Sequence, residues 1–338
     1  MTHRDDHHDT SLEELLEESV TATGAAARRP ETQPTSVVAL DGVPSPRSVQ
    51  LTALGRTAQA VVSSPSVSTT LPDVALRAGL TLDRERLDAY CHLLGERALE
   101  TAPPGFVHVS VFGLQLALMA RADFPLPMLG LVHIANRIEQ LRPVRTDEPL
   151  TATTWARRLA SREVGEGMGT QVELVTEIRS GVELVWQGVS TYLARSTQIT
   201  GLPAHQRPEH PTFEAPTPTG GWETSLRSSK LYAEVSGDRN PIHTSKLAAR
   251  AFGYRATIAH GMDTAARALA ALGPARGDAF TWSVEFAAPV LVPGRVAVGV
   301  ERRDDVDSSD GGSRAGYALT VWDPRRGKLH LTSTLAQA

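Results

Sequence analysis

Apolar positions along residues 50–196 follow two periods, first that of helices and then that of strands. From Asp83 to Leu94 apolar side chains recur at helical spacing, which predicts a helix with one buried face. Residues 109–121 are apolar almost all round, as expected of a fully buried helix. Beyond them, segments rich in Val, Thr and Leu are separated by glycine-containing turns and predict strands at 150–159, 170–179 and 182–194.

The same order recurs in residues 221–338. A helical stretch and a loop precede an apolar helix predicted at 261–272, and strands are predicted at 281–286, 295–302, 316–322 and 329–335. Local sequence repeats as well: Ile138-Glu-Gln-Leu-Arg-Pro-Val aligns without a gap with Val284-Glu-Phe-Ala-Ala-Pro-Val, 146 positions later. The pattern indicates a tandem duplication of one α+β unit.

Two segments lack this periodicity. Residues 1–50 are acidic and then rich in Thr, Ala, Pro and Ser, so they are predicted to form a disordered acidic tail that cannot offset the entropy of ordering. Residues 197–220 contain five prolines and are predicted to form an extended, exposed linker. The predicted organisation is therefore the tail, a first unit at 51–196, the linker, and a second unit at 221–338.

Charge and cysteine content exclude several kinds of protein. The 338 residues hold 34 Lys+Arg and 38 Asp+Glu, a net charge of −4, and no basic field favours nucleic acid as a partner. Cys91 is the single cysteine, so an intrachain disulfide is impossible and a reducing, cytoplasmic location is expected. No apolar run reaches the roughly 20 residues of a membrane helix, and the N-terminus lacks the pattern of a secretory signal, so no membrane insertion is expected.

One segment of the second unit carries candidate chemistry. Asp238 and His243 lie five positions apart across Asn240-Pro241, and Pro241 interrupts any helix, so the two side chains can converge across a turn. A carboxylate and an imidazole that converge can hold one water and move its protons, which suits adding water to a double bond. Neither a Ser nor a Cys is placed for activation as a nucleophile. Downstream, Gly261 opens the predicted helix with a bare N–H at a positive helix end, where an oxyanion can sit.

These residues stand in a recognisable motif. Tyr232-Ala-Glu-Val-Ser-Gly-Asp-Arg-Asn-Pro-Ile-His, followed by Ala259-His-Gly-Met, resembles the hydratase 2 motif of MaoC-like (R)-specific enoyl-CoA hydratases and 3-hydroxyacyl-thioester dehydratases. The resemblance implies a hotdog fold, in which a curved antiparallel sheet wraps a central helix. Long members of the family carry two such repeats, which implies an α+β double hotdog with a non-catalytic repeat at 51–196 and a catalytic repeat at 221–338. The first half also resembles that of bacterial long-form acyl dehydratases.

The resemblance also implies roles for single residues. The family's catalytic Asp and His fall on Asp238 and His243, and its Asn, which orients the loop and the water, falls on Asn240. The Gly whose amide binds the thioester oxygen falls on Gly261. Further motif positions fall on Tyr232, Ser236, Gly237 and Pro241, which shape the loop, with Ser236 also a candidate for substrate binding, and on His260, which either braces the loop or acts directly. Because the thioester is itself the electron sink, no metal or other cofactor is expected.

The implied activity is the reversible interconversion of trans-2-enoyl and (3R)-3-hydroxyacyl thioesters of CoA or acyl carrier protein in fatty-acid metabolism. The first unit lacks the motif, and Leu114 stands 146 positions before His260, so one active site per chain and a roomy acyl tunnel in the first unit are expected. In that unit, His108 and His133 are interpreted as structural or pocket-lining. Two alternatives stay open, a hotdog acyl-CoA thioesterase and an inactive acyl-thioester-binding protein. The chain is expected to be a monomer or a homodimer.

Overall fold

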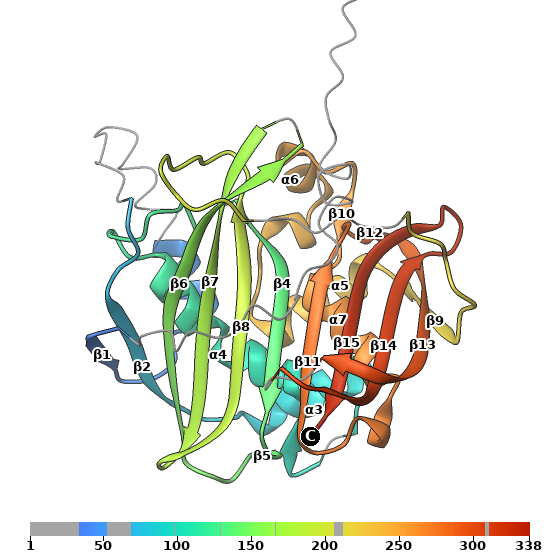
Figure 1. Ribbon diagram of the computed structural model, residues 1–338, viewed down its shortest axis with the longest axis horizontal. Coiled ribbons are helices and arrows are strands. Elements are labelled where there is room, and N and C mark those ends of the chain that lie inside the picture. The colour runs from blue at the N-terminus through green and yellow to red at the C-terminus, as the bar shows by residue number, and fades with distance from the viewer. Residues whose placement is uncertain are drawn as a thin grey trace, which may run out of the picture.

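The computed structural model describes residues 34–52, 69–97, 99–128, 130–165, 167–205, 212–307 and 311–338 (Figure 1). The first half forms one helix-and-meander unit. Its elements are β2 (Val74–Leu80), α3 (Arg84–Leu94), β3 (Thr101–Ala102), α4 (Pro104–Met119), β4 (Leu131–Gln140), β5 (Val144–Arg145), β6 (Leu150–Val164), β7 (Gly167–Ser180) and β8 (Glu183–Ala194). The predicted helices and strands of this half all occur, and α4 begins earlier than expected because two prolines support its first turn.

The second half repeats this order with one longer connection. Its elements are β9 (Gly220–Thr224), α5 (Leu226–Ser236), η1 (Pro241–His243), α6 (Lys246–Ala251), β10 (Thr257–Ile258), α7 (Gly261–Ala270), η2 (Gly273–Arg276), β11 (Phe280–Phe286), β12 (Leu291–Val292), β13 (Gly294–Asp307), β14 (Ser313–Asp323) and β15 (Lys328–Gln337). Each unit contains a short strand pair beside its main helix, β3 with β5 and β10 with β12. The structure is therefore the expected α+β double hotdog.

The two repeats share one sheet. In the described part of the chain it has eleven strands in the order β1-β2-β6-β7-β8-β4-β11-β15-β14-β13-β9, with β1 spanning Ser36–Leu40. At the junction β4 pairs with β11, and Arg137 lies opposite Ser283, its own counterpart 146 positions later. The Arg137 guanidinium donates to the Ser283 hydroxyl at 3.0 Å. This register relates the two repeats by an approximate twofold axis that passes between β4 and β11.

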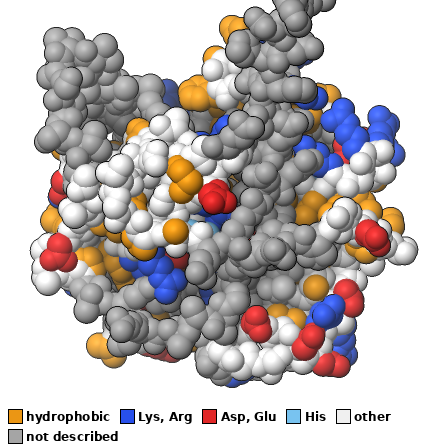
Figure 2. Space-filling view, turned by 45° about the horizontal axis from the view of Figure 1, so that its top comes forward, with side chains coloured by type: hydrophobic (Ala, Val, Ile, Leu, Met, Phe, Trp, Pro, Cys, Tyr) orange, Lys and Arg blue, Asp and Glu red, His pale blue; other side chains and the backbone are white. Residues whose placement is uncertain are grey.

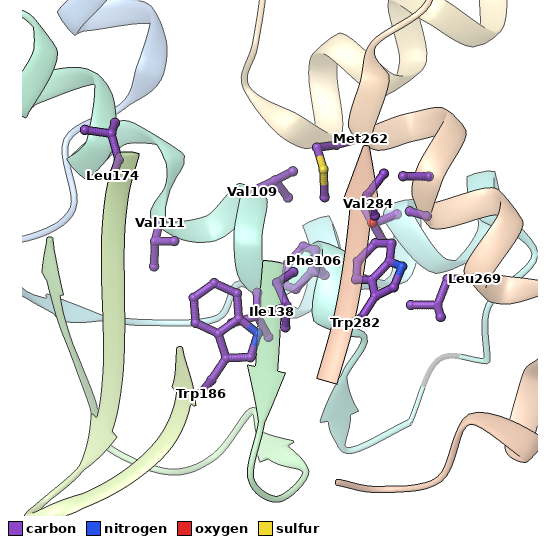
Figure 3. Packing of buried hydrophobic residues seen from close by; sticks show 14 of the residues in the cluster. Phe106, Val109, Val111, Ile138, Leu174, Trp186, Met262, Leu269, Trp282 and Val284 are labelled. Carbon is purple, nitrogen blue, oxygen red and sulfur yellow. The ribbon is translucent and has the colours of Figure 1, made fainter. Parts of the chain in front are cut away.

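The helices cover one face of this sheet and build a core that spans both repeats. In Figure 1, α3, α4, α5 and α7 lie behind the strands, and α3 packs against both α5 and α7. Figure 3 shows Trp186 and Trp282 on either side of Ile138, all fully buried at the junction. Truncating a buried Trp to Ala costs about 3–5 kcal/mol, so the two tryptophans stabilise the packing of the repeats against each other.

The N-terminal expectation is wrong for part of its range. Residues 36–40 form β1, which pairs in parallel with the edge of β2, and residues 46–52 are helical. Ser36-Val-Val-Ala-Leu is short but apolar and partly β-branched, and the open edge of β2 supplies backbone partners that composition alone cannot reveal. The expected disorder of residues 1–33 lies outside the described residues.

The segment between the repeats is only partly the exposed linker that was expected. Ile199 is buried, and backbone hydrogen bonds join Ser161 of β6 to Pro203 and His205. Residues 212–219 are irregular and lead into β9, while 206–211 lie outside the described residues.

The described surface carries no single-sign face in the view of Figure 2, where basic and acidic side chains lie in small separate groups. Within the described residues, no helix is both long and apolar enough to cross a bilayer.

Candidate active site

The candidate site lies in the connection from α5 to α7. A reciprocal capping box between Ser225 and Ser228 starts α5, and Gly237 ends it with a left-handed φ of 76° that turns the chain sharply. Asn240 then caps the short helix η1, with its side chain accepting from the Ile242 N–H at 3.3 Å, and Pro241 occupies the first helical position. These local signals place Asp238 and His243 on one side of a tight turn.

Three side chains converge there. His243 Nε2 lies 4.0 Å from Asp238 Oδ2, and His260 Nε2 lies 3.9 Å from the same oxygen. The two imidazoles stack with their centroids 3.8 Å apart. A separation of 4.0 Å is too long for a direct hydrogen bond, but it leaves room for a water bound to both His243 and Asp238.

Backbone contacts define how the two histidines carry their protons. His243 Nδ1 lies 3.0 Å from the Ile258 carbonyl oxygen, which can only accept, so its proton sits on Nδ1 and the Nε2 lone pair faces Asp238. His260 Nε2 lies 3.0 Å from the Asp238 carbonyl oxygen and therefore donates to it. His260 thus braces the loop that carries Asp238.

The polar groups around Asp238 favour its ionised form. Burial opposes ionisation, but His260, His243, the Asn240 N–H at 3.1 Å and the Gln50 amide at 3.3 Å together hold the pKa of Asp238 below its usual value. Burial lowers the pKa of His243 against the opposing pull of Asp238. Around neutral pH the pair is therefore a carboxylate and a neutral imidazole, two acceptors for one water.

Gly261 begins α7 directly after His260 and faces the same cavity. The first N–H groups of a helix have no acceptor within the helix, and the dipole makes this end positive. A Cβ at Gly261 would lie 2.9 Å from Phe286 Cε1, so a side chain there would push the helix end away from the site. Glycine therefore keeps the amide open to an incoming oxygen.

The remaining motif residues support the loop. The Ser236 hydroxyl accepts from the Asp238 N–H at 3.2 Å, which commits it to shaping the turn. The Tyr232 ring packs 4.9 Å from His260, and its buried hydroxyl has no partner among the described residues. The structure thus brings together all the motif positions identified in the sequence, and His243 and His260 both face the Asp238 carboxylate.

The same cluster could be considered for a cation, because Asp238, His243 and His260 offer ligand atoms within 4.8 Å of one another. However, His243 Nδ1 and His260 Nε2 already meet carbonyl oxygens, as a donated proton requires. A structural or catalytic zinc takes three or four protein ligands at about 2 Å. The described geometry fits a water between His243 and Asp238 better than such a coordination shell.

A cavity of about 540 Å³ opens beside these residues and is lined by both repeats. The second repeat contributes the motif, while α4 contributes the apolar side chains of Val109, Phe112 and Leu116. Gln50 lines the cavity and contacts Asp238, although the sequence predicts that it belongs to the disordered tail. A chain segment far from the motif gives no local signal that it returns to it.

Comparisons with known proteins agree with this geometry. The MaoC like domain family matches residues 206–321. The chain is 32% identical over 257 residues to 3-hydroxyacyl-thioester dehydratase X of Mycobacterium tuberculosis, covering 76% of this chain and 86% of that protein. The protein therefore belongs to the family of MaoC-like dehydratases.

Further relatives support the assignment. A stretch of 74 residues is 40% identical to 3-hydroxybutyryl-CoA dehydratase of Methylorubrum extorquens, covering 21% of this chain and 47% of that protein. The crystal structure of HtdX of Mycobacterium tuberculosis superposes with a TM-score of 0.63 at 31% identity, covering 78% of this chain and all (100%) of that one. A MaoC-like dehydratase from Phytophthora capsici shares the fold, with a TM-score of 0.60 at 19% identity over 80% of this chain and 97% of that one.

Proposed function

We propose that this protein catalyses the reversible addition of water to trans-2-enoyl thioesters, giving (3R)-3-hydroxyacyl thioesters, in fatty-acid metabolism. The observation that carries the proposal is the 4.0 Å separation of Asp238 Oδ2 and His243 Nε2, two acceptors that face one another beside the cavity. One water between them can donate a hydrogen bond to each and present its lone pair to the substrate. Membership of a dehydratase family supports the same reaction.

The pair can move protons without any further group. In hydration, the water oxygen bonds to C3 while Asp238 or His243 takes one of its protons, and the C2–C3 π electrons move onto the thioester carbonyl. A proton then returns from the pair to C2, so that OH is added at C3 and H at C2. Proton transfer by a placed side chain contributes about 10²–10⁴-fold to such a rate.

The developing charge on the thioester oxygen needs a donor, and Gly261 is placed to supply one. Its N–H opens α7 at the positive end of the helix and lines the same cavity as Asp238 and His243. In other enzymes, removing one oxyanion donor costs about 2.7–4 kcal/mol of transition-state stabilisation. The amide therefore lowers the barrier to attack at C3.

The substrate is proposed to place its acyl tail along the apolar wall provided by α4. The thioester arm is common to CoA and acyl carrier protein, and either carrier is compatible with Arg47 and Arg239 at the cavity, whose guanidinium groups suit phosphate oxygens. A cytoplasmic location and a bacterial origin, and a monomeric or homodimeric state, are parts of the same proposal.

Hydration of trans-2-enoyl-CoA substrates of increasing length, followed as loss of enoyl absorbance, tests the proposal. The full-length protein is expected to hydrate them, and Asp238→Asn is expected to be nearly inert. If wild type and Asp238→Asn are equally inert on short and long chains, the proposed function is wrong. A thiol reagent in parallel detects hydrolysis, and release of free CoA without hydration would favour a thioesterase.

A further inference from the structure

A second group of polar side chains lines the cavity from the first repeat, outside the hydratase motif. His108 lies on α4, His133 on β4 and Tyr192 on β8, and all three line the same cavity as Asp238. The rings of His108 and His133 stack at 5.9 Å with an interplanar angle of 11°, and Tyr192 stacks on His133 at 4.8 Å. An otherwise apolar wall thus contains two adjacent imidazoles.

These imidazoles are incompletely satisfied by the protein. Nδ1 of His108 and Nε2 of His133 are buried and have no hydrogen-bond partner among the described residues. His108 as a whole is only 3% exposed. Buried polar atoms are nearly always paired, by protein, water or ligand, because leaving them unpaired costs free energy. The pair therefore indicates a partner that enters through the cavity.

The expected partner carries no charge. Burial lowers the pKa of His108 to about 4, and burial together with His108 lowers the pKa of His133 to about 3, so both rings are neutral at physiological pH. A neutral imidazole offers one donor and one acceptor, which match a hydroxyl, carbonyl or ether oxygen. Phe112 and Leu116 on the same cavity wall provide no countercharge for an ionised group.

One aromatic ring connects this group with the oxyanion donor. The centroid of the Phe286 ring lies 5.3 Å from that of His133, and the ring edge lies against Gly261. An acyl chain that extends from a thioester held at Gly261 towards His133 therefore lies beside Phe286.

We infer that His108 and His133 form a polar subsite in the acyl tunnel that recognises an uncharged oxygen substituent on the chain beyond C3. The inference rests on the proposed function and adds a substrate class to it, namely acyl thioesters oxygenated along the chain. The non-catalytic repeat then selects substrates as well as housing them.

An oxygen scan of the substrate tests this. In a series of trans-2-enoyl-CoAs of equal chain length, one methylene at C5, C6, C7 or C8 is replaced by an ether oxygen, and kcat/KM for hydration is measured for each. Wild type is expected to prefer one oxygen position about five- to tenfold over the other positions, the size of one neutral hydrogen bond. His108→Leu and His133→Leu should flatten this profile, while His92→Leu on the exposed face of α3 should leave it unchanged.

A conservative variant and a folding control distinguish the loss of the subsite from a loss of structure. His108→Gln retains a donor and an acceptor and should keep part of the preference, and thermal denaturation shows whether each variant is folded. Hydration of all chains with a flat wild-type profile, or a preference that survives in both leucine variants, would overturn the inference alone. If no chain of any kind is hydrated, the proposed function fails and the inference fails with it.

Discussion

The two repeats have the same order of elements but differ in one connection and one helix. In the first repeat α3 runs into β3 through residues 95–100, whereas in the second α5 reaches β10 through residues 237–256. The longer connection carries Asp238, η1 with His243, and α6. The catalytic motif therefore lies in a connection that is longer in the second repeat, while both repeats have the same sheet and core.

The main helices differ in a complementary way. Helix α4 starts at Pro103-Pro104-Gly105 and is buried nearly all round, whereas the shorter α7 starts at His260-Gly261. When the strand pairs β3–β5 and β10–β12 are taken as equivalent, His260 corresponds to Pro103-Pro104 of the first repeat and not to Leu114. An offset of 146 positions does not relate the starts of the two helices, because in the second repeat the connection before the helix is longer and the helix itself is shorter. The comparison teaches that a repeat without the motif can still shape the site, since α4 supplies the apolar wall of the cavity.

The largest expected effect comes from the pair that only the second repeat possesses. Asp238→Asn and His243→Gln each keep roughly the size of the side chain but remove a base that can take a proton from the water, so kcat should fall about 10²–10⁴-fold. Steady-state hydration of an enoyl-CoA measures this. The corresponding region of the first repeat has no such pair, so a double variant with substantial residual activity would show that the chemistry lies elsewhere.

A slightly smaller effect is expected at the start of α7. Gly261→Ala places a Cβ 2.9 Å from Phe286 Cε1 and displaces the helix end, so kcat should fall about 10²-fold through loss of oxyanion stabilisation. Adding Phe286→Leu removes the obstructing ring edge and should restore part of the rate. Unchanged kcat in Gly261→Ala would mean that this amide does not bind the thioester oxygen.

A third effect tests the segment that lies outside both repeats. Gln50→Leu removes the 3.3 Å hydrogen bond to Asp238 Oδ1 and should lower kcat/KM about tenfold, the size of a hydrogen bond to a charged group. It should also raise the pKa of Asp238. Ser48→Ala changes an exposed side chain on the same helical stretch and is the matched control. Equal values of kcat/KM in the two variants would show that the hydrogen bond from Gln50 does not contribute to catalysis.

The pH dependence of kcat/KM follows from the protonation states that the site requires, an ionised Asp238 and a neutral His243. Burial lowers the pKa of His243 below its usual 6.5, and the groups around Asp238 hold the pKa of its carboxyl below its usual 3.8, so both groups are in their basic form at neutral pH. Activity should therefore be lost only as pH falls, and the midpoint of this loss in kcat/KM should lie below pH 6.5. A midpoint above 6.5 would contradict the neutral, buried imidazole.

The smallest expected effects are on stability and should be similar in the two repeats. Asp83 caps α3 by accepting from the Arg86 N–H at 2.7 Å, and Ser225 caps α5 through its capping box. Asp83→Ala and Ser225→Ala should each lower the free energy of unfolding by about 1 kcal/mol. Chemical denaturation measures both, and a loss confined to one helix would show that the repeats are not energetically alike.

How much the sequence could predict depends on whether the signal is local. Asp238, Asn240 and His243 lie within one turn, and Gly237 and Pro241 dictate that turn, so the site was visible as a motif. The repeated helix-and-meander order was visible because alternating and helical periods survive in both halves.

The rest depends on contacts between distant segments. β1 forms because the edge of β2 accepts a parallel partner, and Gln50 reaches Asp238 from 188 positions away. The place of His260 depends on a carbonyl oxygen that no side-chain pattern encodes. Neither periodicity nor composition carries such information.

Hydration of a trans-2-enoyl-CoA in D₂O, with chiral analysis of the product, tests the central claim most directly. If Asp238 and His243 of the second repeat add water across the double bond, the product is the (3R)-3-hydroxyacyl-CoA with one deuterium at C2, and Asp238→Asn forms almost none. A (3S) product, free thiol without a hydroxyacyl product, or equal turnover by wild type and Asp238→Asn would contradict the account.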